Sequence, residues 1–438
     1  MNNIIPAPFD LRIARSASRN LLSIPGPENI TRVQLPNGIV VLTRSNFNSP
    51  SVVVSGYFPA GGLLDPEEKL GLADFTALAL QRGTQNRDFQ QIYDALESVG
   101  AGLSFGGGTH TTSFGGRSLA EDLDLLLELL SEALRWPAFP SDPVERLRAQ
   151  LLTGLAIRAQ DTAEMASLTF DQIVYAHHPY SLPEDGYPET IQAITTTDLA
   201  AFHQRAYGPR GLVIVIVGAV EPQAAVDKVA ATLGNWSNPH QIAVPELPPV
   251  TPLTETALRK VSIPGKSQAD IVLGVSGPER RSPDFMAASL GNSVLGQFGM
   301  YGRIGEVVRE QNGLAYYAYS SLSGGSGPGP WYFSAGVAPN NVEKAIDLIR
   351  QEISRFVSKP VFPEELADSQ ANFVGRLPLS LESNAGVASA LLNLEHYELG
   401  SDYYLRYPNL VQAVTPEAIL EVARRYLHAD RLGIAVAG

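Results

Sequence analysis

The chain contains an internal duplication. Residues 187–218 recur at 407–438, with 220 residues between each pair of matching positions. The matching residues are Tyr187, Pro188, Gln192, Ala193, Thr195, Arg205, Leu212, Ile214 and Gly218 in the first copy, and Tyr407, Pro408, Gln412, Ala413, Thr415, Arg425, Leu432, Ile434 and Gly438 in the second. Identities in register indicate two copies of one structural unit. Because 438 residues are also too many for one ordinary core, we expect two homologous domains.

Each copy is expected to combine strands with helices. In the first copy, Pro36-Asn37-Gly38 lies between two apolar runs, which is a strong signal for a β-hairpin. Further strands are expected at 51–57 and 212–217, and helices near 70–82, 88–99, 120–135, 144–166 and 197–206. A block of strands followed by helices predicts an α+β fold, in which each copy forms a mainly antiparallel sheet covered by helices.

A proline-rich stretch separates the two copies. It has five prolines between residues 239 and 252 and no periodic pattern, as is typical of a linker. We therefore predict an N-terminal domain at 1–238, a linker at 239–256 and a C-terminal domain at 257–438. Within the first domain, residues 1–30 are expected to form an N-terminal arm interrupted by prolines.

Composition excludes several classes of function. A formal charge of −13 makes nucleic acid an unsuitable partner, since phosphate binding needs a basic face, and favours basic peptides instead. The absence of cysteine excludes disulfides, thiolate metal sites and cysteine nucleophiles. No apolar run approaches the ~18 residues of a membrane helix, and no secretory signal is visible. We expect a cytoplasmic protein without a membrane partner, with the periplasm as the alternative.

A helix is expected within residues 71–84. Residues 71–75 and the closing Gly83-Thr84 resemble, in register, the zinc helix of the pitrilysin-type metallopeptidases, also called inverzincins. The resemblance extends over nearly the whole chain and includes Leu35-Pro36-Asn37-Gly38. In that family the helix carries His-x-x-Glu-His, which places two His ligands on one helix face with a Glu beside them as the base.

The metal-binding side chains of that family are missing here. Asp74, Ala77 and Leu78 occupy the His, Glu and His positions, and Leu155 occupies the position implied for the third ligand, a Glu. A catalytic zinc needs three protein ligands. The resemblance therefore implies that this chain binds no metal of its own.

Two other catalytic readings have less support. No two of the seven histidines are spaced at i, i+3 or i, i+4, so a rebuilt zinc site and an independent peptidase are disfavoured. Gly102-Leu103-Ser104-Phe105-Gly106 matches the nucleophile elbow of serine hydrolases, but a helix precedes it where the elbow needs a strand. We expect a plain edge strand at this position.

Arg309 and Tyr316 form the strongest positive signal. A short helix is expected around 304–309, a stop at Asn312-Gly313 and a strand at 314–320. On chemistry alone, the pair could be a helix-end Arg near the carbonyl dipole and a Tyr packed in a sheet. Arg-Glu-x-x-Gly-Leu-Ala-Tyr is, however, similar to the second-half motif of the pitrilysin and mitochondrial-processing peptidases, whose Arg and Tyr reach the zinc site and hold the substrate carbonyl. The glycines at 324–329 also lie where relatives have a glycine-rich segment.

The resemblance implies a division of labour between two chains. In the bacterial two-subunit branch of this family, one chain carries His-x-x-Glu-His and the other carries the Arg/Tyr pair. The sequence thus predicts the non-catalytic, substrate-binding subunit of a heterodimeric zinc peptidase that cleaves unfolded peptides, with zinc and general base supplied by the partner. The alternative is an inactive homodimer that holds peptides or acts as a scaffold. The 220-residue offset also predicts a second copy of the 71–82 helix at 291–302.

Overall fold

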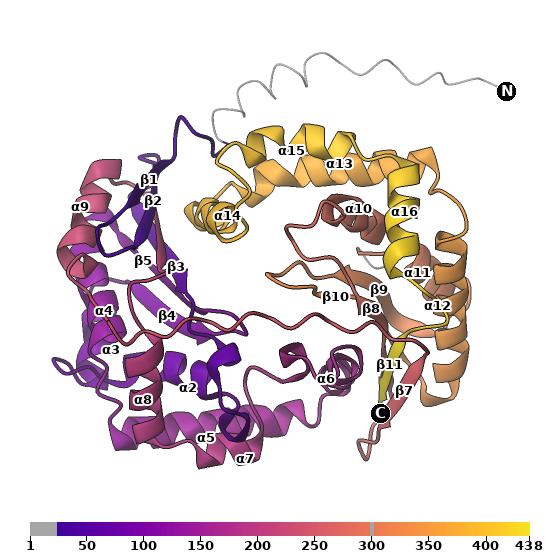
Figure 1. The fold of residues 1–438 in the computed structure, drawn as a ribbon, viewed down its shortest axis with the longest axis horizontal. Coiled ribbons are helices and arrows are strands. Elements are labelled where there is room, and N and C mark those ends of the chain that lie inside the picture. Colours follow the sequence, from indigo (N-terminus) through magenta and orange to yellow (C-terminus); the bar gives the residue numbers. More distant parts are fainter. Residues whose placement is uncertain (1–23, 298–301) are drawn as a thin grey trace.

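The computed structural model describes residues 24–297 and 302–438. Two halves, each a sheet with helices packed on it, face each other (Figure 1). The N-terminal arm predicted at 1–30 lies largely outside the described residues. Within those ranges, no helix is both long and apolar enough to cross a membrane.

The first half contains a six-stranded sheet in the order β1-β2-β6-β3-β5-β4. Its pairs are antiparallel except for β2 with β6. The predicted hairpin joins β1 to β2, and Gly38 at its turn has φ +96°, which favours glycine. The strands are β1 Thr31–Gln34, β2 Val40–Ser45, β3 Ser51–Phe58, β4 Gly102–Gly107, β5 Thr112–Leu119 and β6 Val213–Gly218.

The helices of the first half lie on the outer side of this sheet, apart from α6. They are α2 Leu72–Ala79, α3 Phe89–Ser98, α4 Leu123–Arg135, α5 Ser141–Arg158, α6 Thr162–Val174, α7 Pro188–Ala193, α8 Thr196–Ala206 and α9 Pro222–Leu233. The single helix predicted at 144–166 is wrong, because the structure has α5 and α6 in its place. Asp161 separates them by capping α6, as its carboxylate accepts hydrogen bonds from the backbone N–H groups of Ala163 (2.9 Å) and Glu164 (3.0 Å).

The second half repeats the first. Its five-stranded sheet has the order β7-β11-β8-β10-β9, which is the order of the first sheet without β1. Its strands are β7 Ala257–Val261, β8 Ala269–Ser276, β9 Ala315–Leu322, β10 Pro330–Val337 and β11 Gly433–Ala437. Its helices are α10 Phe285–Leu295, α11 Arg303–Gly305, the π-helical turn Glu306–Glu310, α12 Val342–Phe356, α13 Pro363–Ser380, α14 Asn384–His396, α15 Tyr403–Gln412 and α16 Pro416–Tyr426. The segment 239–256 between the halves contains neither helix nor strand.

The second copy of the zinc-helix equivalent was predicted in the wrong place. Its counterpart, the helix after the central strand β8, is α10 at Phe285–Leu295, which overlaps the predicted range only at 291–295. Residues 298–301 of the predicted range lie outside the described residues. The connection after β3 spans residues 59–71 and includes two 3₁₀ turns, whereas the connection after β8 spans only 277–284. The 220-residue offset therefore holds for the starts of α8 and α16 and of β6 and β11, but not here.

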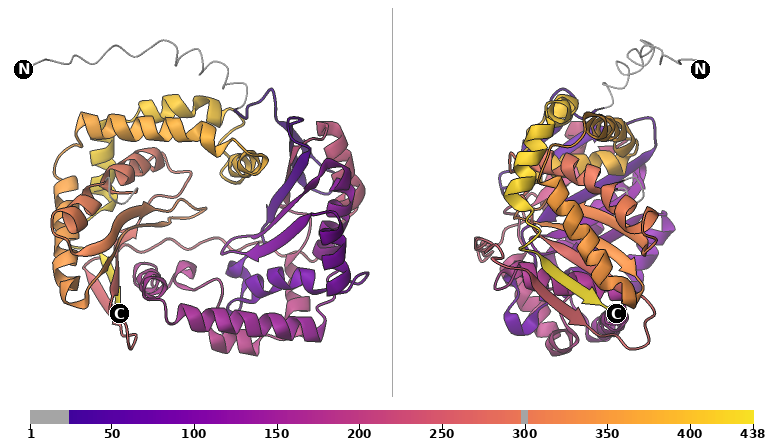
Figure 2. Two further views of the ribbon diagram at one scale, coloured as in Figure 1. Left: turned by 180° about the vertical axis from the view of Figure 1, so that it is seen from behind. Right: turned by 90° about the vertical axis from the view of Figure 1, so that its right-hand side faces the viewer.

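The two halves exchange equivalent helices. From the first half, α6 packs Phe170, Ile173 and Val174 against the second sheet, in a buried cluster with Val272 and Ala435. From the second half, α14 packs against the inner face of the first sheet, and Figure 2 shows both contacts from behind. The α14 residues in this cluster are Val387, Ala388, Ala390, Leu391 and Leu394, which meet Val40, Leu42, Val213, Val215 and Val217. Each sheet is therefore packed against a helix that belongs to the other half.

We expect Leu391→Ala to destabilise the whole protein. Leu391 is fully buried between α14 and the first sheet, and a Leu→Ala change in a core costs about 2–5 kcal/mol. Urea unfolding would measure the loss. Leu379→Ala, at an exposed position of α13, is the matched control and should change the free energy of unfolding by less than about 0.5 kcal/mol. Equal effects would contradict a clamping role for α14.

Candidate functional site

Contacts from neighbouring segments fix the start of helix α2. It begins after Gly71, whose φ of +90° suits glycine, and a Cβ there would lie 2.7 Å from Ile191 Cδ1. The carboxylate of Asp65 accepts hydrogen bonds from the backbone N–H groups of Gly71 and Ala73, both at 2.9 Å. These bonds satisfy donors that the first helical turn leaves free. Contacts from neighbouring segments therefore hold the start of this helix in place.

The four positions that correspond to zinc ligands and base do not fit a metal. Ala77 is fully buried, Leu155 on α5 is 4% exposed, and Leu78 packs against the same core. Asp74 alone carries a ligand atom, and its carboxylate accepts a hydrogen bond from the backbone N–H of Gly107 at 3.0 Å. Burial raises the pKa of Asp74 to about 6. Among the described residues, no group of three His, Asp or Glu side chains is arranged to hold a metal ion.

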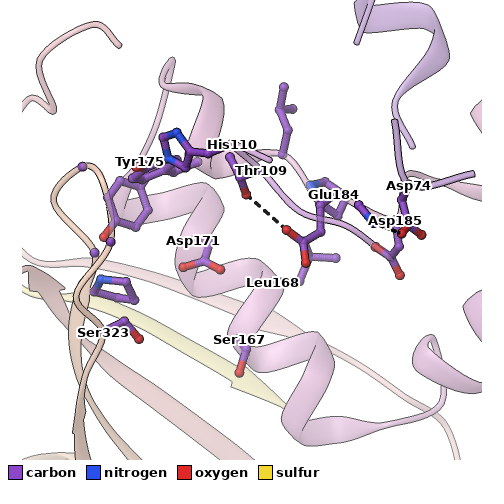
Figure 3. A pocket seen from close by; sticks show the side chains of 18 of the residues that line it. Asp74, Thr109, His110, Ser167, Leu168, Asp171, Tyr175, Glu184, Asp185 and Ser323 are labelled. Carbon is purple, nitrogen blue, oxygen red and sulfur yellow. Dashed lines mark hydrogen bonds between the residues drawn. The ribbon is translucent and has the colours of Figure 1, made fainter. Parts of the chain in front are cut away.

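A cavity of about 620 Å³ lies beside α2, between the two halves. Figure 3 shows carboxylates from several segments around it, together with the rings of His110 and Tyr175. The acidic lining residues are Asp74, Glu164, Asp171, Glu184 and Asp185. Arg158, the lining cation, bonds to the Asp185 carboxylate and to the carbonyl oxygen of Gly186. The cavity is thus suited to cationic and not anionic groups.

The glycine-rich loop between β9 and β10 closes one side of this cavity. Tyr175 donates a hydrogen bond to the carbonyl oxygen of Pro328 at 3.0 Å, and Tyr397 donates to that of Gly324 at 3.3 Å. Ser326 Oγ and His396 Nε2 share a hydrogen bond of 2.9 Å. Side chains of α14 and of the segment after α6 therefore hold this loop. In the sequence, only the glycines at 324–329 indicated that this side of the cavity is formed by a loop.

We expect Asp171→Asn to stabilise the protein at pH 8 and to have little effect at pH 4. The Asp171 carboxyl makes no hydrogen bond within the described part of the chain, and burial raises its pKa to about 7, against about 3.9 in an unfolded chain. Because the pKa is higher in the folded state, the protonated carboxyl favours folding, and this contribution to stability is complete below the unfolded-state pKa. The contribution is lost as pH rises through the folded-state pKa. Asn removes the ionisation, so the free energy of unfolding at pH 8 should rise by about 1–3 kcal/mol.

Urea titrations at both pH values would measure this difference. Glu164→Gln, which removes an exposed carboxylate from the same cavity, is the control and should show no comparable rise. A stabilisation by Asp171→Asn of equal size at pH 4 and pH 8 would contradict ionisation as its cause.

Arg309 and Tyr316 lie at the two ends of one tight connection in the second half. Arg309 is in the π-helical turn Glu306–Glu310, where its Nε lies 3.6 Å from Oε1 of Glu310. The turn ends at Gly313, which has φ +62°, as predicted for a helix stop. Tyr316, on β9, is 83% exposed, and its hydroxyl makes no hydrogen bond with any described residue. Neither side chain lines the cavity beside α2.

The remaining sequence motifs are structural. Ser104 lies on β4, as expected, and its hydroxyl donates a hydrogen bond to the carbonyl oxygen of Gly115 at 3.2 Å. His178 Nδ1 accepts a hydrogen bond from the backbone N–H of Tyr180 at 3.0 Å, which fixes the turn after α6. Neither residue has the partners of a nucleophile or a metal ligand.

Comparison with known proteins identifies the fold. The family model described as insulinase, peptidase family M16, matches residues 40–180, and the model described as peptidase M16 inactive domain matches residues 193–373. The chain is 25% identical to an uncharacterized zinc protease of Streptomyces coelicolor, with 94% of this chain and 91% of the relative covered. It is 24% identical to the non-peptidase homolog YmxG of Helicobacter pylori, with 93% of each covered.

A solved structure extends the likeness to three dimensions. The crystal structure described as a peptidase M16 inactive domain from Pseudomonas fluorescens matches with a TM-score of 0.87 and 26% identity, over 94% of this chain and 98% of that one. The two family models together span most of the described chain, and the duplicated α+β halves agree with them. The chain belongs to peptidase family M16.

Proposed function

We propose that this chain is the non-catalytic, substrate-binding subunit of a heterodimeric zinc peptidase. The observation that carries the proposal is the contrast between two sites of one chain. At α2 the helical frame persists, yet Ala77, Leu78 and Leu155 offer no ligand atom. At β9, by contrast, the Tyr316 hydroxyl is free to reach another molecule. A buried frame without ligands and an exposed donor suit a chain that completes another chain's active site.

In this proposal Arg309 and Tyr316 bind the carbonyl oxygen of the scissile peptide bond. A guanidinium and a phenol are both hydrogen-bond donors. Donors aimed at an oxygen that gains charge in the transition state stabilise that state more than the ground state. The Arg309 side chain is 36% exposed, and its nearest anion, Glu310, is a neighbour in sequence. An exposed ion pair of this kind contributes little, so the guanidinium is available to a substrate.

The partner would carry His-x-x-Glu-His and would supply the zinc and the general base. The substrates would be unfolded peptides, and the acidic lining of the cavity beside α2 supports a preference for cationic segments. The name of the Helicobacter relative, a non-peptidase homolog, is consistent with a chain that does not cleave alone.

Co-expression tests this assignment. The chain would be produced alone and together with a His-x-x-Glu-His subunit from the same genome, and the products would be sized by light scattering and analysed for zinc. We expect a one-to-one complex whose zinc stays with the partner when the chains are separated. A homodimer that ignores the partner would support the scaffold alternative, and zinc in this chain alone would contradict both.

A further inference from the structure

Tyr316 occupies a β-bulge in the edge strand β9. Tyr317 faces Gly336 of β10 and Ala315 faces Val337, but the register shifts between Gly336 and Val337, so Tyr316 has no partner of its own. Bulges re-aim side chains and occur next to active sites. The direction of the Tyr316 side chain therefore depends on what holds the bulge.

The next residue, Tyr317, is tied to a buried carboxylate. Its hydroxyl donates a hydrogen bond to Oδ1 of Asp270 on β8, and Asp270 is only 2% exposed. Burial raises the pKa of Tyr317, so this phenol keeps its proton and remains a donor at neutral pH. Tyr317 directly follows Tyr316 in the chain, so a fixed Tyr317 ring constrains the backbone of the bulge from which the Tyr316 side chain projects.

Gly336 leaves the space through which the Tyr317 ring reaches Asp270. Strand β10 lies between β8 and β9, so the ring must cross β10 to reach Asp270. At the crossing point, a Cβ on Gly336 would lie 2.6 Å from Cε1 of Tyr317 and 3.0 Å from Oδ1 of Asp270. Any side chain at Gly336 would therefore push the ring away from the carboxylate.

Asp270 also connects the bulge to the other half of the molecule. Its Oδ2 accepts a hydrogen bond from the hydroxyl of Thr162, the first residue of α6. Gln268 Nε2 lies 3.1 Å from Oδ1 and 3.3 Å from Oδ2. Donors from β9, from the start of α6 and from the residue before β8 thus converge on one carboxylate.

We propose that Asp270 is a positioning residue for Tyr316, acting through the Tyr317 hydroxyl and the bulge. The inference rests on the proposed function of Tyr316 as a carbonyl-binding donor. Loss of the Tyr317 hydroxyl frees the bulge, so that Tyr316 points in several directions and is less often aimed at the substrate. The chemical step then slows, whereas the affinity for the rest of the peptide is retained.

A double-mutant cycle in the assembled peptidase tests this coupling. Tyr317→Phe should lower kcat about 10- to 100-fold, the scale of a misplaced catalytic group, with KM changed less than about two-fold. Combined with Tyr316→Phe, it should cause no further loss, since both changes remove one function. Tyr319→Phe, whose ring centroid lies 5.8 Å from that of Tyr317, is the control and should leave kcat unchanged. Losses that multiply would overturn the proposal.

A second measurement separates this inference from the proposed function. The chain has no cysteine, so Tyr316→Cys and Lys344→Cys, the latter at an exposed position on α12, provide two unique sites for spin labels on the isolated chain. Tyr317→Phe should broaden the distance distribution between the labels, and Tyr319→Phe should not. If Tyr316→Phe leaves catalysis unchanged, the proposed function fails while this distance still decides the positioning. An unchanged distribution in the Tyr317→Phe background would overturn the positioning role whatever the activity.

Discussion

Tyr316→Phe is expected to lower the turnover of the assembled peptidase about 10²- to 10³-fold, because the loss of one donor to a developing oxyanion costs roughly that factor. The substitution removes a single hydroxyl from a side chain that is 83% exposed. The fold and the complex should therefore remain intact. Cleavage of a peptide at saturating concentration, together with sizing of the complex, would measure both quantities.

The control for this prediction is a tyrosine with no proposed role. Tyr93→Phe changes another exposed tyrosine, on α3, and should leave turnover unchanged. Arg309→Ala should reproduce the loss caused by Tyr316→Phe, while Arg281→Ala, at an exposed ion pair, should not. An intact Tyr316→Phe complex with normal turnover would remove Tyr316 from the reaction.

Arg303→Ala should cause the largest loss of stability, about 3–5 kcal/mol, as expected when one partner of a buried ion pair is removed. The Arg303 side chain is 8% exposed and donates to both carboxylate oxygens of Glu365, at 2.8 and 2.6 Å. Its Nη1 lies 3.5 Å from Glu352, whose side chain is 2% exposed. Without the guanidinium, the buried Glu352 charge would keep only one cation, the exposed Arg355, whose Nε lies 3.3 Å from Oε2 of Glu352.

The dependence of this loss on pH gives a further check. Burial raises the pKa of Glu352 even with Arg303 present. A raised folded-state pKa contributes stability below the unfolded pKa that is lost as pH rises. The deficit of Arg303→Ala should therefore be smaller at pH 4 than at pH 8 in urea titrations. Arg406→Ala breaks an exposed pair with Asp402 and should cost at most about 0.5 kcal/mol at either pH. A deficit that does not change with pH would contradict the buried-charge explanation.

The architecture was largely predictable because many of the duplicated residues lie in elements that begin 220 residues apart, such as α8 at Thr196 and α16 at Pro416. Helices α8 and α16, and strands β6 and β11, occupy equivalent positions in the two copies. The identical residues in these elements, 220 positions apart, are enough to indicate two similar halves. The same offset failed for α10, because the length of a surface connection is not constrained by the pattern of core residues.

The exchange of helices between the halves was not predictable from local patterns. The residues that α6 uses on the second sheet, such as Phe170 and Ile173, are simply apolar residues on one helix face. Periodicity shows that a helix has a buried face but not which sheet covers it. The cavity beside α2 follows from this arrangement and was therefore also invisible in the sequence.

The candidate site was also only partly predictable from the sequence. The residue types at Asp74, Ala77, Leu78 and Leu155 were enough to predict that no zinc fits, since three of them have no ligand atom. The exposure of Tyr316 and the bulge that carries it depend on the register between β9 and β10. Register is set by contacts with the neighbouring strand, and a sequence pattern within β9 does not contain it.

Reconstitution of peptide cleavage tests the central claim most directly. This chain and a His-x-x-Glu-His subunit from the same genome would be purified separately and assayed on an unfolded peptide, each alone and mixed in equal amounts. The proposed division of labour predicts no cleavage by this chain, little by the partner alone, and a rise of about 10²-fold or more on mixing, the scale of the supplied donors. Cleavage by this chain alone, or full activity of the partner without it, would contradict the claim.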